Sequence, residues 1–338
     1  MGGCGRVTAG YDSIPSPVTT AAIRHDAHLY AIVDLPHPSG CAAVAVARAI
    51  CEGAGGRLFA LQLRMKGAST RERVAAARAV APVTAAFNVP LWMNDDGAAA
   101  LAAGPPVAGL HVGQADEDLR RIDAIVQKAR AGGRHLAVGI STHDETQHRR
   151  AEARAPSLVA FGPVRRTATK ANPDSVVGFE GIGRVARRAR RPLVAIGGLR
   201  AADADAVARA GAAAMAVISA LAGPDLDAVR ARARALSRAV EAAFAPWDEA
   251  RVAEAVPVLD RTTLADLADL ADDPACLRSL GLPPRFRPVR RGGTVWYRPC
   301  DVADLLDALD KHPCESWQAW RARHPATAPL LAIGRGPR

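Results

Sequence analysis

The chain has 338 residues, of which 49% are hydrophobic, so it is long enough to bury the core of one large domain and a smaller second one. Its net charge of +10 suits a protein that handles anions, either phosphorylated metabolites or nucleic acid. No apolar run approaches the ~20 residues of a membrane span, and none of signal-peptide length opens the chain, so a cytoplasmic protein without membrane contact is expected.

The chain opens with residues 1–27, whose Gly, Thr, Ser and Pro content predicts a flexible leader. From residue 28 to residue 245, short apolar runs alternate with Ala-rich amphipathic stretches. Each run is followed by polar or glycine residues, which is typical of parallel strands buried on both faces. The eight predicted strands are 29–33, 58–63, 90–93, 109–112, 136–140, 158–161, 193–196 and 215–218.

The stretches between these strands have helical periodicity. The predicted helices include 42–52, 70–80, 118–131, 144–153, 179–190, 201–210 and 225–243. The second should stop just before Pro82, because proline cannot continue a helix. Eight strand–helix units favour a closed (β/α)8 TIM barrel, with an open sheet as the alternative that alternation alone leaves. No Gly-x-Gly-x-x-Gly follows the first strand, which counts against a dinucleotide-binding sheet.

After residue 245 the pattern changes, and residues 246–338 are predicted to form a small, mostly helical C-terminal domain with a frayed end. Helices are expected at 262–271 and 301–309. Between them, residues 285–298 contain five arginines and no acid, and Gly292 and Gly293 predict a hairpin turn. The fold class is therefore α/β, a TIM barrel followed by this small domain.

Polar residues gather where the predicted strands end, which is where a barrel of this kind has its active site. Gln62, Arg64 and Lys66 alternate along the second strand, so they share the side that faces the barrel mouth. A glutamine, an arginine and a lysine on one face form a fork suited to a polyanion.

Two carboxylates follow the third and fourth strands. Asp95 comes after Asn94, and Asp116 lies in the next strand's loop, with neither a cysteine pair nor zinc-spaced histidines nearby. Either aspartate alone could cap a helix. As a pair beside an anion fork they favour a hard cation, Mg2+, shared with a substrate phosphate.

The remaining strand ends are also polar, and the last two predict a second anion site. The fifth leads to Ser141 and His143, and the sixth leads to a loop that contains Thr167, Thr169 and Lys170. The last two end in Gly198 and in the pair Ile218–Ser219, in the loops where this fold commonly binds phosphate through backbone amides. His143 could transfer a proton, or it could simply bond at a helix start or add polarity to a substrate site.

These segments, in this order, resemble the thiamine-phosphate synthase family over about residues 28–245. The matching stretches are residues 29–34, 62–66, 94–95, 109–116, 139–143, 162–164, 167–170, 196–198 and 216–219. The resemblance is specific because many spaced motifs agree, although no single one would suffice.

The resemblance implies a transferase of thiamine biosynthesis. It would condense 4-amino-5-hydroxymethyl-2-methylpyrimidine pyrophosphate with a thiazole phosphate, giving thiamine phosphate and pyrophosphate. Pyrophosphate would leave first, and the thiazole nitrogen would then attack the pyrimidine methyl cation. The implied metal ligands for Mg2+ are Asp95 and Asp116, and the residues implied to neutralise the leaving group are Arg64, Lys66 and Lys170. The pyrimidine substrate would contact Gln62, Arg64, Lys66, Asn94, Ser141 and Lys170, and the thiazole phosphate would contact Thr167, Thr169, Gly198, Ile218 and Ser219.

Three positions depart from the family pattern. Met65 stands where the family often has Glu or another polar residue, and Asp96 stands where it often has Arg, although Asp also occurs there. Arg165 and Arg166 replace the usual aromatic residue and proline. A carboxylate in place of a cation at residue 96 could weaken a polyphosphate site, and one of these two arginines could compensate.

Two rival functions stay open. A thiazole tautomerase of the same superfamily would use His143 as acid–base, but it would leave the Asp95–Asp116 pair and the anion fork without a purpose. Alternatively, the C-terminal region vaguely resembles an excisionase-like winged helix-turn-helix. That reading implies a ligand-sensing barrel fused to a DNA-binding tail, whereas a capping or dimerisation module is the plainer alternative. The sequence also leaves open whether the chain forms a homo-oligomer.

Overall fold

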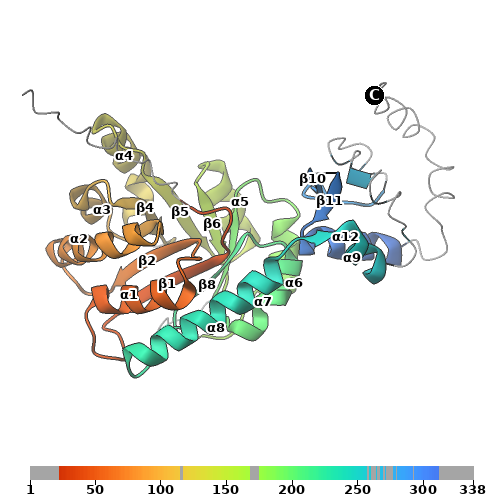
Figure 1. The fold of residues 1–338 in the computed structure, drawn as a ribbon. Helices are drawn as coiled ribbons and strands as arrows, with labels where there is room; N and C mark the ends of the chain where they lie inside the picture. Colours follow the sequence, from red (N-terminus) through yellow and green to blue (C-terminus); the bar gives the residue numbers. More distant parts are fainter. Residues whose placement is uncertain are drawn as a thin grey trace, which may run out of the picture.

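Eight parallel strands close into a barrel that is surrounded by helices (Figure 1). The structure is a computed structural model that describes residues 23–114, 117–167, 175–256, 259, 264, 267–268, 271, 277–278, 280–291 and 293–311. The barrel strands are β1 (Leu29–Leu35), β2 (Ala60–Met65), β3 (Leu91–Asn94), β4 (Val107–Val112), β5 (Ala137–Thr142), β6 (Leu158–Phe161), β7 (Leu193–Ile196) and β8 (Ala214–Val217). Each pairs with the next in parallel, and β1 also pairs with β8. The predicted closed barrel is thus confirmed.

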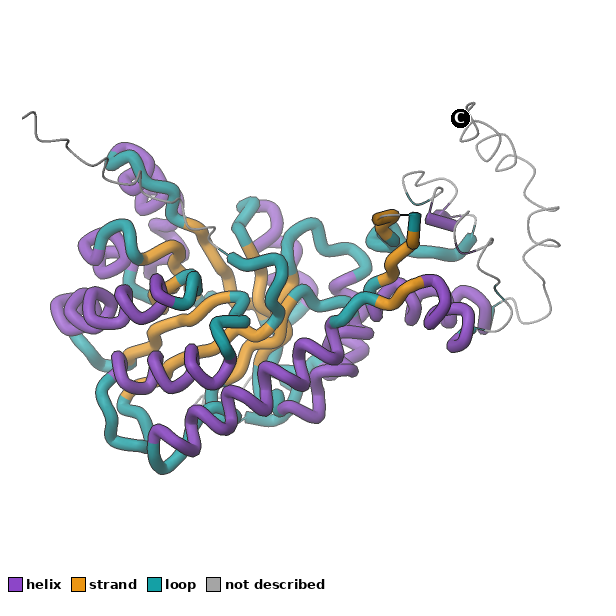
Figure 2. Tube along the Cα trace, in the orientation of Figure 1, coloured by secondary structure: helices purple, strands orange, loops and turns teal. Residues whose placement is uncertain are grey.

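Strand alternation sorts side chains into two layers. On β1, Leu29, Ala31 and Val33 belong to the large apolar cluster, whereas Tyr30 and Ile32 belong to a second cluster that also contains Trp92 and Ala160. Because successive strand residues point to opposite faces, one layer packs against the helices and the other fills the barrel. Figure 2 shows the same arrangement, with the barrel strands inside and the helices around them.

The surrounding helices agree with most of the predicted ranges. They are α1 (Ala43–Ala54), α2 (Thr70–Ala86), α3 (Gly97–Ala103), α4 (Glu117–Ala131), α5 (Glu145–Ala153), α6 (Gly178–Ala186), α7 (Ala204–Ala210), which follows a short 3-10 turn, and α8 (Leu226–Phe244). The stop predicted before Pro82 is wrong, because α2 runs through this proline to Ala86. Its buried residues Val80 and Val83 flank the proline, so packing offsets the one backbone hydrogen bond that proline cannot donate.

Two further corrections concern chain segments beside the barrel. The short helix α3 is absent from the predicted set. The expected leader of residues 1–27 lies mostly outside the described residues, but its last part is not loose. Ile23 is buried in the cluster that fills the barrel, and the Arg24 guanidinium donates to the Gly56 carbonyl oxygen at 2.7 Å.

The C-terminal region has an apolar cluster of its own, which includes Val252, Phe286 and Val302. Its described elements are β9 (Trp247–Asp248), α9 (Glu249–Ala255), β10 (Val289–Arg291), β11 (Thr294–Tyr297) and α12 (Pro299–Asp310). The predicted hairpin is confirmed by the antiparallel pairing of β10 with β11, and α12 contains the predicted helix at 301–309. Most of the predicted helix at 262–271 lies outside the described residues.

The helix α12 packs against α7 on the outside of the barrel (Figure 1). The Arg285 side chain donates to the Ala210 carbonyl oxygen at the end of α7 and to both carboxylate oxygens of Asp304, at 2.7–2.8 Å. Gly211 leaves room for this arginine, since a Cβ there would lie 2.0 Å from Arg285 Nη1. Helix ends of this kind lie at the amino-terminal side of the strands, so the contact is remote from the barrel mouth.

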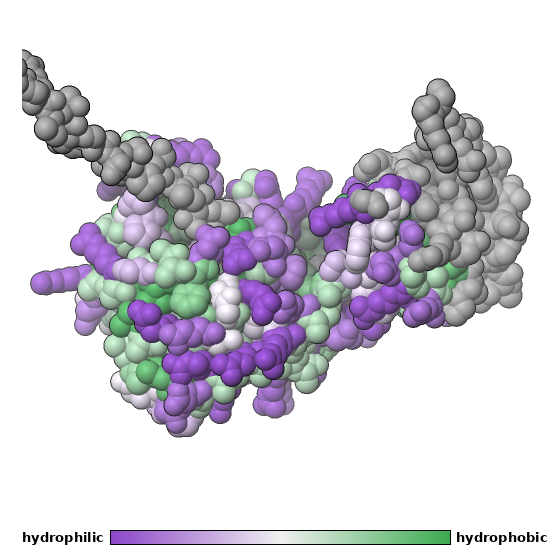
Figure 3. Space-filling view, in the orientation of Figure 1, coloured by the Kyte–Doolittle hydropathy of each residue, from purple (hydrophilic) through white to green (hydrophobic). Residues whose placement is uncertain are grey.

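The surface on the face seen in Figure 3 mixes hydrophilic side chains with pale and apolar patches. Among the described residues, no helix combines the length and the apolar character that crossing a membrane would need.

Candidate functional site

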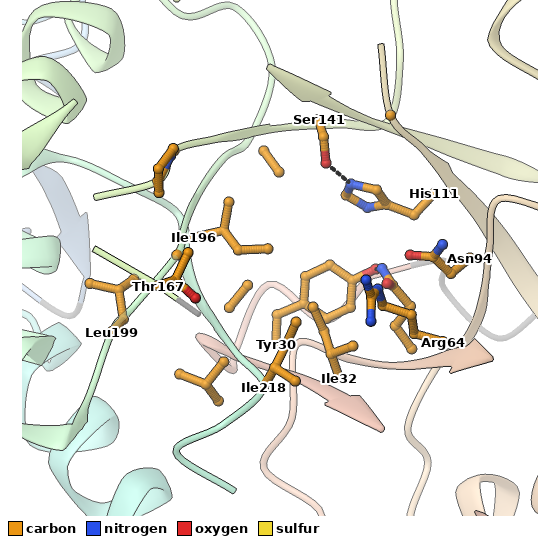
Figure 4. Close-up of a pocket in the computed structure, with 18 of the residues that line it drawn as sticks. Tyr30, Ile32, Arg64, Asn94, His111, Ser141, Thr167, Ile196, Leu199 and Ile218 are labelled. Carbon is orange, nitrogen blue, oxygen red and sulfur yellow. Dashed lines mark hydrogen bonds between the residues drawn. The ribbon is translucent and has the colours of Figure 1, made fainter. Parts of the chain in front are cut away.

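A cavity of about 450 Å3 opens at the carboxyl ends of the barrel strands (Figure 4). Ten of the predicted site residues line it. They are Gln62, Arg64, Lys66, Asn94, Asp95, Ser141, Thr167, Gly198, Ile218 and Ser219. The other three, Asp116, Thr169 and Lys170, lie outside the described residues. Residues from at least six strand ends therefore meet around one space.

The three fork residues, two on β2 and one just after it, line the cavity one above another. Gln62 is buried and donates from Nε2 to the Tyr30 hydroxyl at 2.8 Å. Arg64, one step higher, forms an ion pair with Asp34 on β1, and Lys66 is exposed at the rim. Burial raises the pKa of Tyr30 far above its ordinary value, against the opposing effect of the Gln62 hydrogen bond, so this phenol is neutral at physiological pH.

Two of the three consecutive polar side chains at the end of β3 face the cavity, and the third turns away from it. Asn94 and Asp95 line the cavity, and Asp95 has a left-handed backbone with φ of 59° while its amide donates to the His111 carbonyl oxygen at 2.9 Å. A non-glycine residue in this conformation is uncommon, although Asp tolerates it better than most residues do.

Asp96 turns away from the cavity and links α2 to α3. Its carboxylate accepts from the Ala99 amide at 2.7 Å, from Thr70 Oγ1 at 2.9 Å and from Arg73 Nη1 at 2.8 Å. Burial would raise the pKa of Asp96, but the three donors outweigh it and hold this pKa below the usual range. Asp96 is therefore a neutralised helix cap rather than an unpaired negative charge in the cavity.

Ser141 on β5 is held from two sides. Its hydroxyl hydrogen-bonds to His111 Nε2 at 3.0 Å, which is the dashed line in Figure 4, and its carbonyl oxygen accepts from Gln114 Nε2 at 2.7 Å. His111 is buried on β4 beside the Tyr30 and Trp92 rings. Sequence reasoning missed Tyr30, His111 and Gln114 as site residues. The alternation of β4 offered a signal for His111, because a histidine within a buried strand calls for a polar partner.

The ends of β6 and β7 approach each other closely. Gly198 has φ of 69°, and a Cβ there would lie 2.5 Å from the Arg166 carbonyl oxygen. Arg165 forms an ion pair with Asp203 at 2.6 Å and lies over the Phe179 ring, and it is not among the residues that line the cavity. It is thus engaged elsewhere, whereas Thr167 faces the cavity (Figure 4).

His143 lines the cavity but is tied to its surroundings. Its Nδ1 lies 2.7 Å from the Gly162 carbonyl oxygen, so this ring nitrogen is the donor, and its amide donates to Gln147 Oε1 at 2.9 Å. These hydrogen bonds agree with the interpretation that His143 bonds to the backbone at the start of a helix.

The cavity has two chemically different walls. In Figure 4, Arg64, Asn94, His111 and Ser141 lie on one side, and Ile196, Leu199 and Ile218 lie on the other. Such a space suits a flat, partly apolar molecule with an anionic group.

The described residues contain no cluster of three His, Cys, Asp or Glu side chains placed as metal ligands. Among the described residues that line the cavity, Asp95 carries the single carboxylate, and Asn94 and Gln114 carry side-chain amides. Carboxylate and amide oxygens are the ligand types that hard cations prefer.

The chain is similar to known proteins over the barrel. The thiamine monophosphate synthase family profile matches residues 29–221. A thiamine-phosphate synthase of Koribacter versatilis is 36% identical over 195 residues, 56% of this chain and 87% of that protein. One of Anaeromyxobacter dehalogenans is 37% identical over 216 residues, 64% of this chain and 90% of that protein. A solved thiamine phosphate pyrophosphorylase from Pyrococcus furiosus, 26% identical, superimposes with a TM-score of 0.54 and covers 65% of this chain and 98% of its own.

Proposed function

The chain belongs to the thiamine monophosphate synthase family of transferases, and on this premise we propose that its cavity joins a hydroxymethylpyrimidine pyrophosphate to a thiazole phosphate. The observation that carries the proposal is the gathering of ten predicted site residues around one cavity, with the β2 fork near one end and the Gly198 and Ser219 loops near the other. Two substrates with anionic groups at opposite ends fit this arrangement.

In the first step, the bond between the pyrimidine methylene carbon and the pyrophosphate oxygen breaks, and the oxygen keeps the electron pair. Arg64 and Lys66, which both line the cavity, are proposed to neutralise the departing charge. Lys170 is proposed to add a third positive charge from outside the described residues. In the second step, the thiazole nitrogen supplies its electron pair to the methylene cation and closes the new C–N bond.

The apolar wall protects the cation. Ile196, Leu199 and Ile218 line the cavity and are proposed to keep water away from the methylene carbon, where its addition would give an alcohol. On the polar wall, Gln62, Asn94 and Ser141 are proposed to hold the pyrimidine. Thr167, Thr169 and the Gly198 and Ser219 amides are proposed to hold the thiazole phosphate.

Asp95 and Asp116 are proposed to hold Mg2+ against the pyrophosphate. Bound there, the ion would offset negative charge on the leaving group. The Asp95 carboxylate and the Asn94 and Gln114 side-chain amides, which all line the cavity, support this assignment.

The test is thiamine phosphate formation from the two substrates, with Mg2+ or with EDTA. Metal-dependent product that falls at least a hundredfold in Asp95→Asn supports the synthase and its metal site together, whereas Asp96→Asn should stay within threefold of wild type. A folded protein that makes no product would refute the proposal, and conversion of a thiazole tautomer instead would assign the isomerase activity.

A second candidate is duplex DNA binding by the C-terminal region, which we place after a domain boundary near residue 246. One observation favours it, namely that Arg290 and Arg291 are exposed on the hairpin strand β10. The other arginines of the 285–298 segment contact Asp304, Asp301 and the Ala271 carbonyl oxygen, so they hold the fold together.

The DNA hypothesis is tested on the full chain at several salt concentrations. Replacing Arg290 and Arg291 by Ala should weaken duplex binding about tenfold or more and lower the salt slope by about two. Ala at Arg149 and Arg150 on α5 is the matched control, since both are exposed. No binding even at low salt would reject this candidate.

A further inference from the structure

Asp34 and Arg64 form an ion pair at the edge of the cavity. The two residues face each other in register on β1 and β2, and Arg64 Nη1 donates to Asp34 Oδ1. The Arg64 side chain is 11% exposed and that of Asp34 is 27% exposed, so water screens the pair only in part. Arg64 lines the cavity and Asp34 does not.

Only part of the Arg64 guanidinium is used by Asp34. An arginine offers five N–H donors, so the others can reach a ligand in the cavity while Nη1 stays on Asp34. A pyrophosphate bound to Arg64 would therefore lie close to the Asp34 carboxylate. The two anions would compete for the same cation and repel each other across a poorly screened space.

We propose that Asp34 is a built-in counter-ion of Arg64 that competes with pyrophosphate and so limits how tightly the leaving group is held. The inference rests on the proposed function, because that function makes pyrophosphate a product that must leave. Asp34 thus has two effects on Arg64. As a hydrogen-bond acceptor it fixes the direction of the guanidinium, and as an anion it weakens the affinity for pyrophosphate.

Asp34→Asn separates these two effects. The amide keeps an oxygen that can accept from Nη1, but it has no negative charge. Inorganic pyrophosphate, titrated calorimetrically with Mg2+ into the full chain, should bind about three to ten times more tightly to Asp34→Asn than to wild type. Pyrophosphate should also become a stronger product inhibitor, and kcat should fall where release limits turnover.

Two controls make the result specific. Asp96→Asn removes a carboxylate that is paired with Arg73 rather than with Arg64, so it should leave pyrophosphate affinity within twofold of wild type. In an Arg64→Gln background, Asp34→Asn should have almost no effect, because the cation for which the anions compete is gone. If Asp34→Asn does not fold, Asp34→Ser replaces it in the same series.

Equal or weaker pyrophosphate binding by the folded, uncharged variant would overturn the proposal and leave Asp34 as an orienting partner alone. A tighter variant whose effect persists without Arg64 would overturn it as well. This result is independent of whether the proposed function is correct, because the binding measurement needs no turnover. A chain that makes no thiamine phosphate can still show the competition, and an active synthase can lack it.

Discussion

At the scale of single residues, two glycines decide what the barrel interior can hold. A Cβ on Gly139 would lie 2.7 Å from His111 Nδ1, and a Cβ on Gly109 would lie 2.4 Å from the Trp92 ring. These two large rings therefore fit inside the barrel only because neighbouring strands present no side chain there. The packing fixes His111 in the wall of the cavity, where its Nε2 holds the Ser141 hydroxyl in one direction.

His111→Phe tests this positioning role. The phenyl ring preserves most of the packing against Tyr30 and Trp92 but cannot hydrogen-bond to Ser141, so kcat/KM should fall about tenfold, or ~1.4 kcal/mol. Ser141→Ala is expected to lower it at least as much. Because the histidine acts through the serine, the double variant should be no worse than Ser141→Ala alone. Steady-state kinetics with thermal unfolding checks this, and fully additive losses would contradict it.

At the scale of secondary structure, the barrel could be predicted because its signals are local. Short apolar runs that end in polar residues predict buried parallel strands, and the strand ends point to a shared mouth. The continuation of α2 through Pro82 could not be predicted, since it depends on the burial of Val80 and Val83 by other elements. The partner of Asp96 was equally hidden, because Arg73 lies 23 residues away in the chain.

In the candidate site too, contacts within one strand could be predicted from the sequence, and contacts between strands could not. The fork of Gln62, Arg64 and Lys66 follows from alternation within one strand, so sequence alone could place it. The contacts of Arg64 with Asp34 and of His111 with Ser141 join different strands. Their pairing needs the strand register, which is set by closure of the whole barrel.

Asp96 gives an element-scale prediction, because it joins α2, β3 and α3. Asp96→Ala should cost about 2 kcal/mol of unfolding free energy at pH 7, since it removes a helix cap and a buried partner of Arg73. The pKa of Asp96 is lowered in the folded state, so its stabilising effect is complete above the ordinary carboxyl pKa of about 4 and is lost as the pH falls through the folded value.

Urea unfolding of wild type and Asp96→Asn at pH 7 and below pH 4 measures this effect. The stability difference between the two proteins should shrink in acid. Asp225, an exposed cap that accepts from the Ala228 amide at 2.7 Å on α8, provides the matched control. Asp225→Asn should cost less at pH 7 than Asp96→Asn. A difference for Asp96→Asn that is unchanged by pH would contradict the assignment.

At the scale of the whole molecule, the C-terminal region is attached where it leaves the cavity untouched. Arg285 connects the end of α7 to Asp304, whose side chain is 1% exposed. Arg187 makes longer contacts to the same helix, 3.8 Å to Asp304 and 3.4 Å to Asp307. One mostly buried arginine and one half-exposed arginine thus share a single interface, and their energetic contributions should differ.

Arg285→Ala should lower the free energy of local unfolding of the C-terminal region by about 3 kcal/mol, because it leaves the Asp304 carboxylate buried without its main partner. Burial already raises the pKa of Asp304 against the effect of Arg285, so the variant should take up a proton at this site. Arg187→Ala, which removes a half-exposed partner, should cost less than 1 kcal/mol. Hydrogen exchange should therefore rise in α12 and β11 for Arg285→Ala alone.

Synthesis of thiamine phosphate should stay within twofold of wild type in both variants, since the interface lies at the amino-terminal side of the strands. A larger loss of kcat/KM in a folded Arg285→Ala protein would instead mean that the docked region acts on the cavity through the barrel.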